Sequence, residues 1–234
     1  MLELEDVHAM YGRSHVLHGV SLNARAGEVV SLLGRNGAGK STTLKAIVGL
    51  VEVTHGEIRL DGRSLRGLTT HAISRAGIGW VPEDRRIFAG LSVRENLLVG
   101  EAGAGDAGRR WPVERVYELF PKLATLEGQR GGSLSGGEQQ MLTIARTLMT
   151  GPRLLLLDEP SEGLAPVVVK TLAENVLALK REGLTILLSE QNLAFARRLA
   201  DRAYIIEKGE IKFEGPFAAL DADAELRRTY LSVG

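Results

Sequence analysis

A glycine-rich segment that ends in a Lys-Ser pair is the first feature of the sequence that could do chemistry. The segment follows the apolar run Val29–Leu33 and opens a helical pattern. Its spacing fits G-x-x-x-x-G-K-[ST], in which backbone N–H groups and a helix N-terminus converge on phosphate oxygens. Lys40 is expected to pair with the β/γ-phosphates of a nucleotide, and the Ser41 hydroxyl to bind Mg²⁺. The expected nucleotide-binding residues are Gly34, Asn36, Gly37, Ala38, Gly39, Lys40, Ser41 and Thr42. The alternative is a glycine-rich turn with an incidental Lys-Ser pair.

Two carboxylates that follow a buried apolar strand form the second candidate group. Asp158 and Glu159 come directly after Leu154–Leu157. Ligands of open parallel sheets bind beyond the carboxyl ends of strands, so these acids should face the same crevice as the glycine-rich segment. Asp158 is placed to hold Mg²⁺ through water, and Glu159 to orient or deprotonate an attacking water. Solvated acids at a strand end are the alternative, which the glycine-rich segment weakens.

A pair of adjacent glycines begins a predicted helix about 100 residues after the glycine-rich segment. Ser135 and Glu138 have the spacing of a capping box, which explains a helix start. It does not explain Gly136 and Gly137, because each glycine in a helix costs about 0.8–1.0 kcal/mol relative to Ala. Bare backbone at a helix N-terminus suits close approach to a phosphate. We therefore expect Ser135, Gly136, Gly137 and Glu138 to form a second phosphate-binding surface.

These motifs together resemble the ATP-binding cassette (ABC) ATPases over essentially the whole chain. The residues that carry the resemblance are the glycine-rich segment, LSGGEQQ at 134–140, and LLLLDEPSEGL at 154–164. The resemblance implies an α/β fold, a P-loop NTPase (RecA-like) core with a mainly parallel sheet. It also implies an antiparallel β subdomain and a helical signature-motif subdomain at about 86–145, all within one domain spanning 1–234. It implies a head-to-tail dimer in which the LSGGE helix of one subunit completes the ATP site of the other.

The resemblance also assigns roles outside the motifs. Tyr11, 23 residues before Gly34, matches an aromatic residue that stacks on adenine, and such stacking is worth about 1–3 kcal/mol in nucleic-acid complexes. A tyrosine that only packs is the alternative. The 161–165 loop resembles the family's D-loop, which contacts the other subunit, except that Ala165 stands where Asp is common.

Two positions depart from the family pattern. Glu83 stands where most members have a Gln near Mg²⁺, and Gln191 where most have a His that contacts the γ-phosphate. All five histidines lie between positions 8 and 71, so none replaces it. Gln191 can donate to phosphate but does not titrate, and Glu83 adds an oxygen ligand suited to Mg²⁺. A site that binds without hydrolysis is the alternative, against which Lys40, Asp158 and Glu159 argue.

The wider pattern looks most like the LivF-like ATP-binding subunits of branched-chain amino acid importers. It consists of VPEDRRIF, LSVREN, SGGEQQM, DEPSEGLAP and SEQN. The resemblance implies a LivG-like second ATPase, or a homodimer in isolation, with two membrane permeases and an extracytoplasmic solute-binding protein. Importers of urea, short-chain amides or polar amino acids remain the alternative. A soluble ABC ATPase acting on nucleic acid or ribosomes is more distant, since no tandem cassette, coiled-coil insertion or zinc module is present.

The elements that must position these residues alternate between short strands and longer helices, which predicts parallel strands joined by crossovers. The predicted parallel strands are Val29–Leu33, Ile78–Pro82, Leu154–Leu157 and Thr185–Leu188, with Leu154–Leu157 central. Peripheral antiparallel strands are expected in the first 30 residues and over 57–61 and 203–213. The predicted helices are 40–49, 92–99, 113–120, 136–149, 166–180 and 192–200, with a loop over 100–110.

Composition bounds the remaining possibilities. The 234 residues suit one α/β domain, and no cysteine is present, which excludes disulfides and thiolate chemistry. Lys+Arg and Asp+Glu are 29 each, so charge alone would not attract nucleic acid, and no nucleic-acid partner is expected. No run approaches the roughly 18 apolar residues of a spanning helix. Taken with the resemblance, this implies a peripheral protein at the cytoplasmic face of the membrane, attached through permease subunits.

Overall fold

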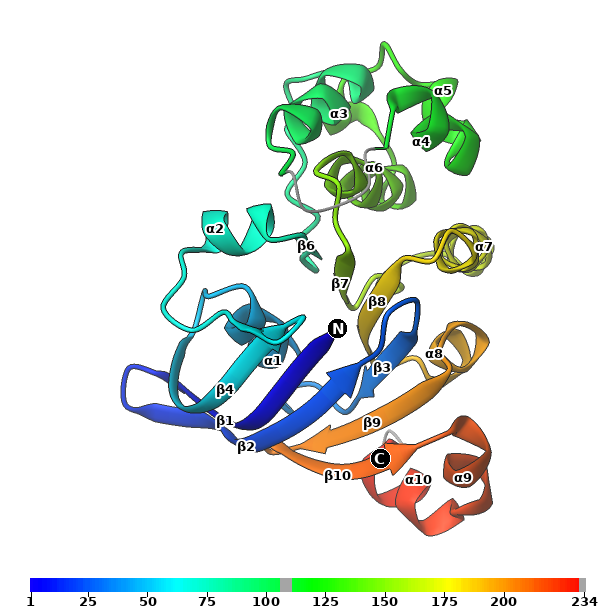
Figure 1. Cartoon of the computed structure of the whole chain (residues 1–234). Coiled ribbons are helices and arrows are strands. Elements are labelled where there is room, and N and C mark those ends of the chain that lie inside the picture. Colours follow the sequence, from blue (N-terminus) through cyan, green and yellow to red (C-terminus); the bar gives the residue numbers. More distant parts are fainter. Residues whose placement is uncertain (106–110, 232–234) are drawn as a thin grey trace.

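A six-stranded sheet forms the centre of the computed structural model, which describes residues 1–105 and 111–231 (Figure 1). Its order is β10-β9-β3-β8-β7-β6, and every neighbouring pair is parallel except β9 and β10. The strands are β3 (Val29–Leu33), β6 (Ile78–Val81), β7 (Leu154–Asp158), β8 (Thr185–Glu190), β9 (Arg202–Glu207) and β10 (Glu210–Gly215). The α/β fold with a mainly parallel sheet is confirmed.

The strand β7 is buried on both faces, as its unbroken apolar sequence predicts. Leu155 and Leu157 pack into one hydrophobic core with α6 and α7, whereas Leu154 and Leu156 pack into the core on the other face. The strand is not central, because only the edge strand β6 lies beyond it. The prediction of a central position was therefore wrong. A strand is buried on both faces wherever helices cover both sides of the sheet, even when the strand is next to the edge.

A second, four-stranded antiparallel sheet with the order β2-β1-β4-β5 confirms the predicted β subdomain. Its strands are β1 (Leu2–Tyr11), β2 (Ser14–Ala24), β4 (Glu52–Leu60) and β5 (Arg63–Ser64). The antiparallel expectation for 203–213 holds for the pairing of β9 with β10, but β9 also pairs in parallel with β3, which was not predicted. The reason is burial: Tyr204, Ile205 and Ile206 are all inside the protein.

The six predicted helices are confirmed, with ends that differ by a few residues. The helices are α1 (Lys40–Ile47), α2 (Thr70–Arg75), α3 (Val93–Ala102), α4 (Val113–Leu119), α5 (Pro121–Ala124), α6 (Gly136–Met149), α7 (Pro166–Arg181), α8 (Leu193–Leu199), α9 (Phe217–Ala222), α10 (Ala224–Tyr230) and the 3₁₀ turn η1 (Gly131–Ser133). The loop predicted over 100–110 begins later, because α3 continues to Ala102, and its part at 106–110 lies outside the described residues.

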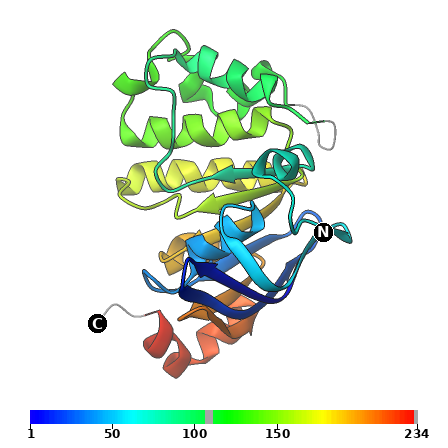
Figure 2. The same cartoon turned by 90° about the vertical axis from the view of Figure 1, so that its left-hand side faces the viewer.

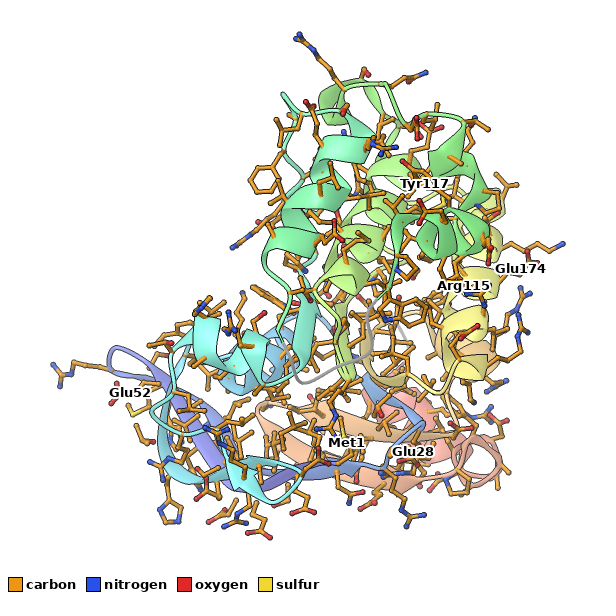
Figure 3. All side chains as sticks on the ribbon, turned by 45° about the horizontal axis from the view of Figure 1, so that its top comes forward. Met1, Glu28, Glu52, Arg115, Tyr117 and Glu174 are labelled. Atoms are coloured by element: carbon orange, nitrogen blue, oxygen red, sulfur yellow. The ribbon has the colours of Figure 1, made fainter. Side chains whose placement is uncertain are left out.

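The helices form layers around the sheets. Figure 2 shows α6 and α7 running side by side above the strands, with α3 to α5 farther out and α9 and α10 at the opposite end. Arg115 of α4 points toward α7 (Figure 3) and forms an ion pair with Glu182 at its C-terminus. The outer helices are therefore joined to the central layer by charge as well as by apolar packing.

Among the described residues, no helix is both long and apolar enough to cross a membrane.

Candidate functional site

The carboxyl ends of β3, β7 and β8 bring the predicted catalytic and phosphate-binding segments to one edge of the sheet. Leu33 pairs with Glu190, so the glycine-rich segment and Gln191 leave neighbouring strands at the same level. Asp158 pairs with Ser189 in the next ladder. The structure therefore places these segments together, as the rule for parallel sheets predicts.

The glycine-rich segment needs glycine for two separate reasons. Gly37 and Gly39 have left-handed backbone angles, with φ of +78° and +115°, which glycine adopts without steric cost. A Cβ on Gly34 would lie 2.5 Å from the carbonyl oxygen of Ile206 on β9. The segment is thus curled by two glycines and pressed against the sheet at a third. It leads into α1, whose first N–H groups have no partner within the helix.

Lys40, the first residue of α1, is buried and holds its ammonium group over the glycine-rich segment. Its Nζ donates to the carbonyl oxygens of Gly34 at 2.8 Å and Arg35 at 3.0 Å. The same Nζ lies 3.0 Å from Glu159 Oε1. A buried ammonium group needs an anionic partner, and Glu159 supplies it in this structure.

Asp158 is the most enclosed acid of the site. Its Oδ1 accepts hydrogen bonds from the hydroxyls of Ser41 at 2.9 Å and Ser189 at 2.6 Å. Burial raises the pKa of Asp158, and the two hydroxyl donors oppose that shift. A hydroxyl and a carboxylate oxygen at this distance are hard ligands of the kind that Mg²⁺ uses, leaving its other positions to phosphates and water. No group of three or more His, Cys, Asp or Glu side chains within the described residues could hold a metal by itself.

Glu159 is set apart from Asp158 by its backbone. Its φ is +45°, in the left-handed region that non-glycine residues rarely adopt. Its N–H is held by the carbonyl oxygen of Ser189 at 3.1 Å and by the Ser189 hydroxyl at 3.2 Å. The nearby Glu162 has a raised pKa because of a hydrogen bond with Glu159, burial and the Glu159 charge.

Glu83 faces the same small hollow as Asp158. This cavity of about 150 Å³ is lined by Lys45, Trp80, Pro82, Glu83, Asp84, Arg86 and Asp158. Two larger hollows, of about 630 and 530 Å³, lie elsewhere, beside β4 and α2. The candidate phosphate site is therefore not among the larger hollows of the described residues. It is formed by backbone atoms and short side chains, which do not enclose a large cavity.

The segment Ser135–Glu138 forms the predicted capping box at the start of α6. The Ser135 N–H and hydroxyl both donate to Glu138 Oε2, at 2.9 and 2.8 Å. A Cβ on Gly137 would lie 2.4 Å from Val168 Cγ1 on α7, so packing within the chain already requires this glycine. A Cβ on Gly136 would meet only the end of the flexible Arg85 side chain, at 2.7 Å.

The remaining predicted residues lie around this core of the site. Tyr11 ends β1 and is 46% exposed, so its ring is open to a ligand. Asn36 is exposed, Thr42 is half-buried in α1, and Ala38 is buried. Gln191 is half-buried, and its N–H donates to Glu190 Oε2 at 3.1 Å.

The sequence-based predictions missed Ser189 and Glu190. Ser189 holds both Asp158 and the backbone of Glu159, and Glu190 is a carboxylate that is only 2% exposed. Burial raises the pKa of Glu190, and hydrogen bonds from Ser161 and Asn192 oppose this shift. The available signal was a Ser-Glu pair at the end of an otherwise apolar strand.

Comparison with known proteins gives the same picture. Residues 17–162 match the family model described as ABC transporter. The chain is 46% identical over 231 residues to the high-affinity branched-chain amino acid transport ATP-binding protein BraG of Pseudomonas aeruginosa, covering 99% of each chain. It is 34% identical over 216 residues to the probable branched-chain amino acid transport ATP-binding protein LivF of Archaeoglobus fulgidus, covering 92% of each. It is also 34% identical over 232 residues to the lipopolysaccharide export system ATP-binding protein LptB of Escherichia coli K12, covering 98% of this chain and 96% of that protein.

A solved structure extends the comparison to the fold. The dimeric post-hydrolysis state of the ATP-binding cassette MJ0796, bound to ADP and Pi, matches with a TM-score of 0.80 at 26% identity. The match covers 92% of this chain and 98% of that one. The sequence matches, the shared fold and the assembled phosphate site lead to one conclusion: the chain belongs to the ABC transporter family, as an ATP-binding subunit with ATPase activity.

Proposed function

We propose that this ATPase powers an importer of branched-chain amino acids. The observation that carries the proposal is the 46% identity to BraG across the full length of both chains. The identity to LptB, an export-system protein, is 34%, so the relationship to the importer subunit is the stronger one. The solute itself would contact other subunits, which makes its identity an inference from relatives.

We propose that Lys40 changes partner when ATP binds. In this structure its Nζ faces the Glu159 carboxylate at 3.0 Å. The β/γ-phosphates of ATP would take that place, because they carry more negative charge than one carboxylate and are also held by the N–H groups of residues 34–42. Glu159 would then be released to accept a proton from the water that attacks the γ-phosphorus, and the bond to the β-phosphate oxygen would break to give ADP and phosphate. Gln191 would donate a hydrogen bond to the γ-phosphate.

The donor set fits Mg²⁺. Ser41 would bind the ion directly, Asp158 would hold it through water, and Glu83 would approach from the adjoining hollow. Bound there, Mg²⁺ would neutralise phosphate charge and align the β- and γ-phosphates. Tyr11 would stack on the adenine ring.

We propose a head-to-tail dimer with a second, similar ATPase, or with a second copy in isolation. Within the chain, Ser135 and Glu138 bond to each other in the capping box, and Lys122 lies 3.8 Å from the Glu138 carboxylate. The backbone N–H groups of Gly136 and Gly137, in the first turn of α6, would serve the ATP bound to the partner subunit. The dimeric state of MJ0796 supports this arrangement.

We propose that the subunit attaches to the cytoplasmic face of the membrane through two permeases, which receive solute from an extracytoplasmic binding protein. The helical subdomain at about 86–145, together with Glu83, would form the docking groove within a single-domain chain. Three large apolar side chains are more than 40% exposed there: Phe88, Leu98 and Val99. Exposed apolar groups of this size suit a protein partner.

The test combines hydrolysis with uptake. Glu159→Gln should abolish ATP turnover and trap an ATP-bound dimer on gel filtration, while Glu174→Gln, an exposed change on α7, should leave turnover unchanged. Unchanged steady-state hydrolysis in Glu159→Gln would eliminate this residue as the base. Cells that lack the chain should lose leucine, isoleucine and valine uptake; loss of urea uptake alone would favour the alternative importer class.

A further inference from the structure

Glu190 is a buried carboxylate that the chemistry proposed above does not use. It is the last residue of β8 and is 2% exposed. An acid is costly to bury unless hydrogen bonds compensate for the lost water. Its contacts therefore show what the protein gains from keeping an acid at this position.

The two oxygens of Glu190 bind two different segments. Oε1 accepts the N–H of Ser161 at 3.2 Å. Oε2 accepts the N–H groups of Gln191 at 3.1 Å and Asn192 at 3.0 Å. One side chain thus joins the loop after β7 to the turn after β8, and Ser161 is 29 residues away in the sequence.

Each of these segments adjoins or contains a residue of the proposed reaction. Ser161 follows Glu159 by two residues and begins the 161–165 loop. The turn after β8 presents Gln191 next to the glycine-rich segment. Glu190 therefore links the loop that follows Glu159, the proposed base, to the turn that carries Gln191, the proposed donor to the γ-phosphate.

We propose that Glu190 is a positioning residue that locks the 161–165 loop and the Gln191 turn into one arrangement around Glu159. The proposal rests on the ATP hydrolysis proposed above. An ionised carboxylate only accepts hydrogen bonds, so both oxygens of Glu190 match N–H donors. In Glu190→Gln one oxygen becomes an NH₂ group that faces a donor, which releases one of the two segments with almost no change in volume.

The test measures turnover and binding separately in the full chain. Losing a hydrogen bond to the charged group that positions Glu159 and Gln191 should lower kcat about 10-fold or more. The affinity for a non-hydrolysable ATP analogue should change by less than about 3-fold, because Lys40 and residues 34–42 are untouched. The matched control is Tyr204→Phe on β9, which removes a buried hydroxyl bonded to Asn23 of β2, Arg202 of β9 and Glu214 of β10, away from these segments.

A kcat equal to that of the wild type would overturn the proposal. The proposal would also be overturned if kcat and analogue affinity fell together and in proportion to the fall in Tm. That result is expected for a purely structural residue such as Tyr204. Absence of hydrolysis in the wild type would instead reject the proposed function.

Hydrogen exchange of the wild-type protein decides the case where the variant does not fold or the wild type does not hydrolyse ATP. The amides of Ser161, Gln191 and Asn192 should exchange slowly and with one common protection factor, once each rate is divided into its intrinsic value, because the two segments should open together. Different protection factors for the two segments would overturn the proposal.

Discussion

Substituting Gly137 by Ala tests whether packing or phosphate approach requires this glycine. The new Cβ would lie 2.4 Å from Val168 Cγ1, more than 1 Å inside the usual carbon contact of about 3.5–4.0 Å. Overpacking between well-packed elements costs about 1–3 kcal/mol, and the helix propensity of Ala returns less than about 1 kcal/mol in a first turn. We therefore expect a net loss of about 1–2 kcal/mol, or roughly 2–8 °C in Tm for a chain of this length.

The assay is urea unfolding of Gly137→Ala, Val168→Ala and the double variant. Val168→Ala removes both methyl groups that the new Cβ would meet, so the double variant should recover about 1 kcal/mol relative to additivity. Gly136→Ala is the matched control, because its Cβ meets only the movable end of Arg85, and its stability should stay within about 0.5 kcal/mol of wild type. Additive single changes, or a Gly137→Ala protein as stable as wild type, would refute the packing argument. A stable Gly136→Ala protein with undiminished ATPase would contradict the phosphate role of Gly136.

Two further predictions concern pH. Glu28, labelled in Figure 3, is partly buried against Arg202, with Oε1 2.6 Å from Arg202 Nε. Burial opposes its ionisation, but hydrogen bonds from Arg202 and the Arg25 N–H hold its pKa below the ordinary value. The stabilisation that Glu28 gives to the folded state is therefore present above the unfolded pKa of about 4.3 and lost as pH falls through the lower folded pKa. In urea unfolding, Glu28→Gln should lower the free energy of unfolding by about 1–2 kcal/mol at pH 7, and this difference from the wild type should shrink toward pH 3. Gln191→His should add an ionisation near pH 6.5 to the kcat profile, whereas the wild type should show no loss from this position between pH 8 and 6; identical profiles would remove support for a contact between residue 191 and the γ-phosphate.

The arrangement of the candidate phosphate site could be predicted from the sequence because its residues follow local rules. Gly34 to Ser41 and Asp158 sit directly at strand ends, and parallel pairing alone brings such ends together. The role proposed for Glu190 could not be predicted in this way, because it depends on a hydrogen bond from the N–H of Ser161. That residue is 29 positions away in the sequence, so no local pattern indicates the contact. The same holds for Gly137, whose packing partner Val168 lies on another helix.

The fold shows the same division. The periodic helices and apolar strands were identified, including the seven-residue helices α4 and α8, whereas α2, α5, α9 and α10, of four to seven residues, were missed. Short helices have too few residues for a periodic pattern, and tertiary contacts hold them. The parallel pairing of β9 was missed because a hairpin signal, Lys208-Gly209, shows only the local partner β10.

The left-handed backbone at Glu159 has a consequence for folding stability. A non-glycine residue in this region costs about 1–3 kcal/mol, so glycine at this position would relieve backbone strain. The same replacement would leave the buried Lys40 ammonium without its anionic partner. Backbone strain and the ion pair with Lys40 therefore act in opposite directions on the stability of a glycine variant at residue 159, and a bound phosphate beside Lys40 would shift that balance toward glycine.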